Sequence, residues 1–189
     1  SQKYGIETVV KAFAKFLERF EEEKRDRFRL EIYGKGELLG HLQQIARDIN
    51  IESRVFFRGF VNNSDIPSKL NQMDVFLLGS ESESFGVAAV EAMACELPVI
   101  ATKASGFCEV IEDKVTGFLV SIGDYEKMAE YMYMLYQDEN LRERIGKKGR
   151  ERVLSMYSWK DNVNRRVQLY QRCKDSTCIS HANEGHDLR

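Results

Sequence analysis

Residues 80–94 read Ser80-Glu81-Ser82-Glu83-Ser84-Phe85-Gly86-Val87-Ala88-Ala89-Val90-Glu91-Ala92-Met93-Ala94. This segment follows an apolar run at residues 74–78 that is typical of a β-strand, and its second half is typical of a buried helix. Glu83 is expected in the loop before the helix, and Glu91 inside the helix. At a rise of ~1.5 Å per residue, Glu91 should lie roughly 7–8 Å along the helix axis from Gly86.

The first turn of a helix carries backbone N–H groups that have no partner within the helix. These groups and the helix dipole make a helix N-terminus a ready site for phosphate. Here such a site would lie between Glu83 and Glu91, whose carboxylates suit hydroxyl groups. A ligand with hydroxyls at both ends and phosphate in the middle would fit, and a nucleotide-sugar is such a ligand.

Apolar periodicity predicts that helices and strands alternate along the whole chain. Strands are expected at residues 28–33, 54–57, 74–78, 98–101 and 117–120. Helices are expected at residues 5–24, 37–49, 64–73, 85–94, 125–137 and 140–156. This alternation predicts an α/β fold with a parallel sheet flanked by helices, which binds its ligands at the carboxyl ends of the strands.

Composition narrows the class of protein. The 189 residues predict one domain at 1–174 and a polar, disordered tail at 175–189. The 43% of hydrophobic and 31% of charged residues are ordinary for a soluble globular protein, and no apolar run approaches the ~20 residues of a membrane span. A net charge of −2 argues against a nucleic-acid partner. The four cysteines lack close pairing, except Cys173 and Cys178, and the N-terminus is not that of a secretory signal, which together favour a cytoplasmic location.

Four motifs in a fixed order carry a family resemblance. The first is Glu83 and Glu91 with seven residues between them, and the second is Ala-Met-Ala-Cys-Glu-Leu-Pro-Val-Ile-Ala at residues 92–101. The third is Ser-Gly-Phe-Cys-Glu at residues 105–109, and the fourth is Thr-Gly-Phe-Leu-Val at residues 116–120. On these motifs the chain resembles the retaining glycosyltransferases of the GT-B fold, particularly family 4, over about residues 3–172.

The resemblance implies a Rossmann-like domain, the C-terminal and donor-binding half of a GT-B fold. Such proteins transfer a sugar from a nucleotide-diphospho-sugar, for example a UDP- or GDP-sugar, with retention of configuration, and generally need no metal or other cofactor. A role in polysaccharide biosynthesis is expected. The acceptor-binding N-terminal domain, and the strand that precedes Lys3 in the family, are expected to be missing here. We therefore expect the isolated chain to be inactive in transfer. The resemblance leaves open a peripheral association of the full-length protein with the inner face of a membrane.

The resemblance also implies roles for residues at the mouth of the predicted helix. Glu83, the predicted catalytic residue, would bind hydroxyls of the transferred sugar, and Glu91 would accept hydrogen bonds from the ribose diol. Sugar hydroxyls and the distal phosphate would be held by four backbone N–H groups, those of Ser84, Phe85, Gly86 and Val87. The alternatives are that Glu83 is a surface-loop acid and that Glu91 is a solvated helix residue, although the apolar neighbours of Glu91 argue against the latter.

Three more segments are expected to line the donor site. Lys3 would neutralise the diphosphate, or else is a solvated terminal lysine. The resemblance implies that Gly34 and Gly36 approach the donor through their backbone, and a simple tight turn is the alternative. The third glycine of a dinucleotide-binding loop is lacking, which argues against a NAD site. Phe60 and Val61 would contact the base, unless they belong to the core at a strand end.

Two positions depart from the family pattern, since Ser105 and Glu96 stand where glycine is common. If position 96 requires a positive φ, Glu96 destabilises the fold by about 1 kcal/mol or more. Rival functions are a glycosidase that uses Glu83 and Glu91 as its acid pair, a sugar-nucleotide epimerase or a phosphorylase of the same fold, and a non-catalytic nucleotide-sugar-binding module. A phosphorylase would need a lysine motif for pyridoxal phosphate, and none is apparent.

Overall fold

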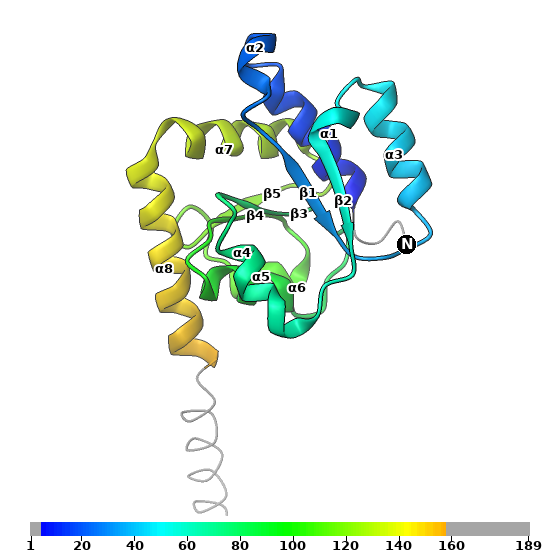
Figure 1. The fold of residues 1–189 in the computed structure, drawn as a ribbon. Coiled ribbons are helices and arrows are strands. Elements are labelled where there is room, and N and C mark those ends of the chain that lie inside the picture. The colour runs from blue at the N-terminus through cyan, green and yellow to red at the C-terminus, as the bar shows by residue number, and fades with distance from the viewer. Residues whose placement is uncertain (1–4, 158–189) are drawn as a thin grey trace, which may run out of the picture. The chain divides into compact units, whose positions relative to one another are not determined.

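Parallel strands and flanking helices build the domain, as the alternating sequence pattern predicts. The structure is a computed structural model, and it describes residues 5–157. Strand β1 (Leu30–Tyr33) pairs with β2 (Val55–Gly59), while β3 (Phe76–Leu78), β4 (Val99–Thr102) and β5 (Phe118–Val120) pair in that order (Figure 1). All three pairings are parallel. The α/β class is confirmed, and the five described strands begin and end within two residues of the predicted bounds.

The strands form a two-stranded sheet and a three-stranded sheet. Leu30 lies opposite Val55 in the first sheet, and Phe76 lies opposite Val99 in the second. Within residues 5–157, no strand pairs with both sheets, so β1 and β3 are each an edge strand of their own sheet. The strand that the family resemblance places before Lys3 falls outside the described residues and stays an expectation. The same holds for the predicted tail at 175–189.

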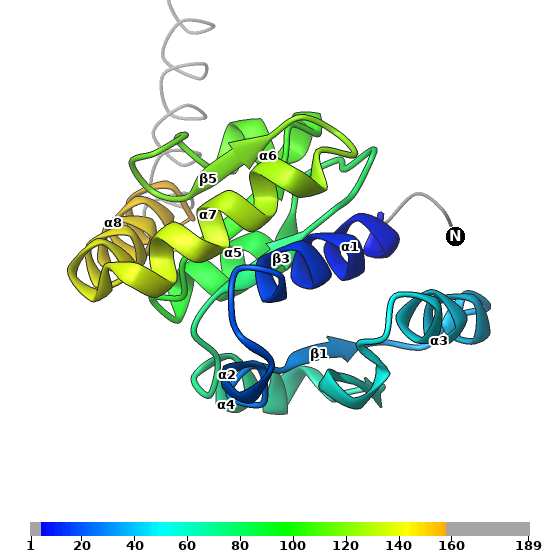
Figure 2. The same cartoon turned by 90° about the horizontal axis from the view of Figure 1, so that it is seen from above.

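Helices α1 (Ile6–Leu17) and α7 (Tyr125–Gln137) pack against each other over one side of the core (Figure 2). Both helices are amphipathic, so each buries one apolar stripe. The stripes meet through five buried side chains, Val10, Phe13, Leu17, Met128 and Leu135. The bounds of α7 coincide with the prediction because Asp124 caps its first turn, where its carboxylate accepts the Lys127 N–H at 2.9 Å.

The helix predicted at residues 5–24 is divided in two. Helix α1 ends at Leu17, and a short helix α2 covers Glu22–Arg25. Phe20 lies between them, with its ring 4.6 Å from that of Phe28 and 5.0 Å from that of Tyr136. Aromatic packing at these centroid distances is favourable. The chain therefore leaves the helix so that Phe20 reaches this cluster.

The remaining predicted helices are present. They are α3 (Leu39–Asp48), α4 (Ile66–Leu70) with a preceding 3₁₀ turn at Asn63–Asp65, α5 (Val87–Ala94) and α8 (Glu139–Tyr157), and a further 3₁₀ turn covers Glu52–Arg54. Helix α6 (Ser105–Val110) was not predicted, because six residues that include Gly106 are too short for a periodic signal. None of the helices within residues 5–157 has the length and apolar character that crossing a membrane requires.

Candidate functional site

The connection from β3 to α5 brings Glu83 to the mouth of α5, as predicted. Ser80, just beyond β3, is buried, and its carbonyl accepts a hydrogen bond from the hydroxyl of buried Thr102 at the end of β4. Gly79 packs so closely on Gly5 that a Cβ on either would collide with the backbone of the other. These contacts anchor the start of the connection on the carboxyl edge of the sheet, where ligands of parallel α/β folds bind.

Residues 83–86, named here the helix-mouth loop, close on the carboxylate of Glu83. Its Oε1 atom accepts three backbone N–H groups, those of Ser84 at 3.0 Å, Phe85 at 3.3 Å and Gly86 at 3.2 Å. Three of the four amides that were predicted to hold the ligand thus donate to Glu83 in this structure. Successive N–H groups around one oxygen form an anion-binding nest. The loop is therefore a site for negative charge, and the protein's own carboxylate occupies part of it.

The first amides of α5 remain available beside this loop. Within residues 5–157, no acceptor faces the backbone N–H groups of Val87 and Ala88. Both belong to the first turn, whose N–H groups have no partner inside the helix. The side chain of Val87 is 60% exposed, so the helix mouth opens to solvent. These two amides are the donors that the described structure leaves for a phosphate group.

Gly86 is required by the geometry of the helix mouth. Its φ of +87° lies in the left-handed region, which favours glycine. A Cβ at this position would also lie 2.8 Å from the ring of Phe107 on α6. Two features within the protein, the positive φ and the close packing of Phe107, thus favour glycine at position 86.

Glu91 lies one turn into α5 and is half-buried. The neighbouring Ala92 and Met93 are fully buried, as the apolar sequence around Glu91 predicts. Among the described residues, no side chain or backbone group forms a hydrogen bond or an ion pair with its carboxylate. A half-buried carboxylate without a partner is unfavourable unless a ligand or solvent satisfies it. Glu91 therefore keeps its full capacity to accept hydrogen bonds from a ligand.

The ends of β1 and β2 bring two more predicted segments together. The N–H of Gly34 donates to the carbonyl of Gly59 at 2.7 Å, so the turn that contains Gly34 and Gly36 lies beside the segment that begins with Phe60. Gly34 has φ +130°. The side chain of Phe60 is 65% exposed, so it does not belong to the core, whereas Val61 is half-buried. Lys3, the predicted contact of the diphosphate, lies outside the described residues.

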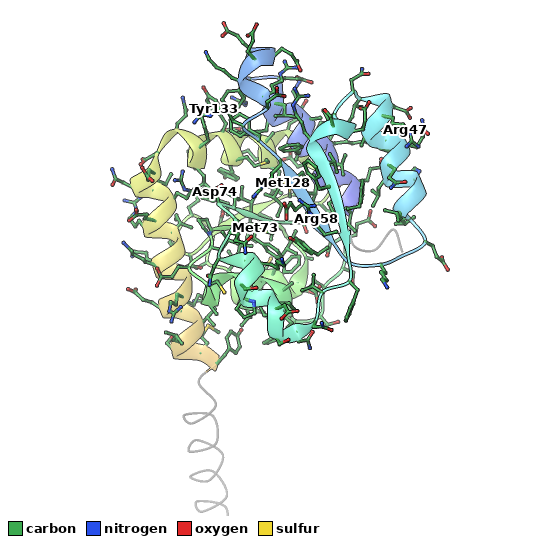
Figure 3. The ribbon with its side chains drawn as sticks, in the orientation of Figure 1. Arg47, Arg58, Met73, Asp74, Met128 and Tyr133 are labelled. Carbon is green, nitrogen blue, oxygen red and sulfur yellow. The ribbon has the colours of Figure 1, made fainter. Side chains whose placement is uncertain are left out.

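An ion pair on the sheet surface, which the sequence did not single out, engages Arg58. Arg58 on β2 (Figure 3) donates from Nη2 to Oε1 of Glu31 at 2.9 Å, and the hydroxyl of Tyr33 donates to Oε2 of Glu31 at 2.6 Å. The hydrogen bond from Arg58, followed by that from Tyr33, holds the pKa of the Glu31 carboxyl below its ordinary value. Burial, followed by the hydrogen bond to Glu31, raises the pKa of Tyr33. Arg58 thus forms its ion pair with Glu31 in this structure.

A cavity of about 570 Å³ lies away from these residues. Its lining includes Lys11 and Lys15 of α1, Arg25 of α2, and Arg54, just before β2. Arg54 donates to Glu22 and to Asp26, each at 2.7 Å. The charged side chains that line the cavity are largely paired with one another or with nearby residues in ion pairs of this kind. The cavity borders the segments that lead into β1 and β2, not the segments that follow these strands. The helix mouth is therefore the better candidate for the functional site.

The acidic side chains of the described residues do not form a metal site. The described part of the chain holds no group of three or more His, Cys, Asp or Glu side chains that could hold a metal ion. The hydrogen-bonding groups at the helix mouth are backbone amides and two carboxylates, which suit an organic phosphate with hydroxyl groups on either side.

Comparison with known proteins agrees with this geometry. The family model described as "Glycosyl transferases group 1" matches residues 1–152. N-acetyl-alpha-D-glucosaminyl L-malate synthase of Bacillus anthracis is 33% identical over 165 residues, which cover 87% of this chain and 41% of the relative. The chain thus spans less than half the length of this relative.

Two solved structures resemble the domain in sequence and fold. The C-terminal domain of a glycosyl transferase group 1 family protein (LpcC) from Francisella tularensis superposes with a TM-score of 0.73 at 28% identity, over 83% of this chain and 81% of that one. Anabaena HepE in complex with UDP-glucose superposes with a TM-score of 0.74 at 27% identity, over 83% of this chain and 42% of that one. By its sequence motifs, its parallel α/β fold and these matches, the chain belongs to the glycosyl transferases of group 1.

Proposed function

We propose that this domain binds a nucleotide-diphospho-sugar at the mouth of α5 and supplies the donor half of a retaining glycosyltransferase of family 4. One observation carries the proposal: the half-buried carboxylate of Glu91 has no partner among the described residues and lies one turn beyond amides that face no acceptor. A ribose diol on Glu91 and a phosphate on the Val87 and Ala88 amides would satisfy both sets of groups. The relative HepE was solved with UDP-glucose, which makes a UDP-sugar the first donor to test.

Each predicted residue has a role in this proposal. Glu83 orients the transferred sugar through the carboxylate oxygen that the loop amides do not use. The backbone at Gly34 and Gly36 lines the donor site, and the exposed ring of Phe60, with Val61, contacts the base. Lys3 neutralises the diphosphate. The residues assigned to the site are Lys3, Gly34, Gly36, Phe60, Val61, Glu83, Ser84, Phe85, Gly86, Val87 and Glu91.

The chemistry follows from where charge develops. When the bond to the sugar breaks, negative charge grows on the leaving diphosphate, and preorganised amides at a helix N-terminus stabilise that charge as it forms. We propose that the leaving phosphate assists the acceptor on the same face of the sugar, which retains the configuration without a protein nucleophile, metal or other cofactor. We propose that the rest of the full-length protein binds the acceptor, and that any general base comes either from that part or from the acceptor itself. On its own, the 189-residue chain is expected to bind the donor without transferring the sugar.

Calorimetric titration tests the donor site. The 189-residue chain is titrated with UDP, GDP and ADP and compared with Glu91→Ala, with Glu23→Ala as the matched control because Glu23 is exposed on α2 and far along the chain from the site. Binding of one nucleotide that weakens by about tenfold or more in Glu91→Ala, and not in Glu23→Ala, supports the proposal. If a folded chain binds no nucleotide at millimolar concentration, or if Glu91→Ala binds normally, the assignment is wrong.

The stereochemical part needs the full-length protein. Transfer from an α-linked UDP-sugar should give an α-linked product, which NMR of the anomeric proton would show. A β-linked product would refute retention and leave donor binding intact.

A further inference from the structure

We infer that the first turn of α6, through Ser105 and Gly106, positions the helix-mouth loop and thereby sets how tightly the sugar part of the donor is held. The inference rests on the proposed function. It concerns residues on a helix that the sequence did not predict, and Ser105 stands where glycine is common in the family.

The carbonyl of Glu83 is the point of attachment. It accepts the backbone N–H of Gly106 at 2.9 Å and the hydroxyl of Ser105 at 3.1 Å. The same residue's carboxylate accepts the amides of the next three residues. Glu83 is therefore held at its backbone by α6 and at its side chain by its own loop. Because Oε1 takes all three amides, Oε2 remains to accept hydrogen bonds from a sugar.

Gly106 brings α6 into direct contact with the loop backbone. A Cβ at this position would lie 2.6 Å from the nitrogen of Phe85, 2.8 Å from the carbonyl carbon of Ser84 and 2.9 Å from the carbonyl oxygen of Glu83. All three are backbone atoms, so no rotation of a side chain could relieve the contact. Any side chain at position 106 must push the loop away from α6 and disturb the amides that hold Glu83.

Ser105 differs from Gly106 because its side chain is exposed and its hydroxyl adds a single hydrogen bond. Removal of that hydroxyl should leave the fold intact and loosen only the attachment of Glu83. The nucleotide is held at other residues, namely Glu91 and the first turn of α5. Ser105 should therefore affect the contribution of the sugar to binding and not that of the nucleotide, a separation that a general loss of stability would not produce.

The first test compares UDP with UDP-glucose. The ratio of their dissociation constants measures the contribution of the sugar in the wild type, in Ser105→Ala and in Ser105→Thr. In Ser105→Ala the affinity for UDP should be unchanged, while the contribution of the glucose should fall by about three- to tenfold, the usual worth of one hydrogen bond. Ser105→Thr keeps the hydroxyl and should show the same contribution of the glucose as the wild type. An unchanged ratio in Ser105→Ala, or an equal loss of affinity for both ligands, would overturn the inference.

The second test needs no ligand. Amide hydrogen exchange of Ser84, Phe85 and Gly86 should become faster in Ser105→Ala, while the Lys127 amide, which Asp124 caps at the start of α7, should exchange as in the wild type. Gly106→Ala should show a larger effect. Gly40→Ala is its control, because a Cβ there would meet no atom within 4 Å.

The two proposals fail in different ways. A wild-type chain that binds neither UDP nor UDP-glucose would refute the donor site, whereas the exchange rates decide the positioning of the loop in either case. Unchanged exchange at the loop amides in both Ser105→Ala and Gly106→Ala would show that α6 does not hold the helix-mouth loop.

Discussion

The carboxylate of Glu83 accepts the backbone N–H of Gly86 at 3.2 Å, across a loop of only four residues. Gly86 is the last residue before α5, so this bond closes the helix-mouth loop directly in front of the helix. The three amides that donate to Glu83 all precede the first residue of α5, Val87, so the carboxylate holds the loop together and is not a cap of the helix itself. A residue predicted from its role toward a ligand thus also fixes the loop that leads into the helix carrying the other acid, Glu91.

Substitution of Glu83 should therefore affect stability in the absence of any ligand. Glu83→Ala removes the acceptor of three loop amides and should lower the free energy of unfolding by about 0.5–1.5 kcal/mol, the usual net contribution of a hydrogen bond. Glu83→Gln keeps one acceptor oxygen and should lower the free energy of unfolding by a smaller amount. Urea unfolding measures both. Glu81→Ala is the matched control, because Glu81 is exposed in the same connection. Equal stability of Glu83→Ala and Glu81→Ala would show that the hydrogen bonds to the Glu83 carboxylate contribute nothing to stability.

Glu96 is strained by its backbone conformation. It follows the end of α5 with φ +59°, and the amide of the next residue, Leu97, donates to the carbonyl of Ala92 at 3.0 Å. This is the arrangement of a Schellman motif, in which glycine is the usual residue. Position 96 therefore has the positive φ at which a side chain is expected to destabilise the fold.

Glu96→Gly should raise the free energy of unfolding by about 1 kcal/mol, because glycine adopts this conformation without a steric penalty. Glu96→Ala is the control: it removes the carboxylate, which lies 3.7 Å from Arg150, and keeps the Cβ. That exposed pair contributes little. Thermal or urea unfolding of the two variants separates the effects, and equal stabilities would show that strain at Glu96 is negligible.

Strands and long helices were predictable because their signals are local. Apolar runs such as residues 98–101 form buried strands, and α7 has both a helical period and Asp124 as its cap. The helix at 5–24 was predicted too long, since the aromatic contacts of Phe20 join residues distant in sequence. Helix α6 was missed because it is short and is held by contacts to another loop.

The site was predictable in its position and not in its internal contacts. A strand followed by a loop and a helix places Glu83 at the helix mouth in any parallel α/β fold. Its hydrogen bonds to its own loop depend on the left-handed Gly86, against which Phe107 of α6 packs. No local pattern contains that information. The same holds for the pairing of Arg58 with Glu31, which joins two strands that are distant in the sequence.

Gly146 on α8 is predicted to tolerate no side chain. A Cβ at this position would lie 1.9 Å from the carbonyl oxygen of Glu96, which follows α5. Gly146→Ala should lower the free energy of unfolding by about 1–3 kcal/mol through overpacking. Gly40→Ala, also in a helix but with no atom within 4 Å of the new Cβ, should leave stability unchanged or raise it by up to about 1 kcal/mol. If the two variants show the same stability in urea, close packing at Gly146 is not a constraint.

The ion pair between Glu31 and Arg58 should make stability depend on pH in the acidic range. The hydrogen bond from Arg58, followed by that from Tyr33, holds the pKa of Glu31 below its ordinary value of 4.5 in the folded protein. The unfolded chain therefore takes up the proton at a higher pH than the folded protein does. For a group with a lowered pKa in the folded state, the stabilisation is present above the pKa of the unfolded state and is lost as the pH falls through that of the folded state.

Glu31→Gln should consequently be less stable than the wild type at neutral pH, and the difference should shrink as the pH is lowered below about 4.5, since acid removes the same charge in the wild type. Urea unfolding at a series of pH values measures this difference. Glu37→Gln is the control, because Glu37 is exposed in the turn after β1 and its variant should follow the wild type at every pH. A difference between Glu31→Gln and the wild type that stays constant with pH would mean that the substitution acts through packing, because the lost stabilisation would then not depend on the carboxylate charge.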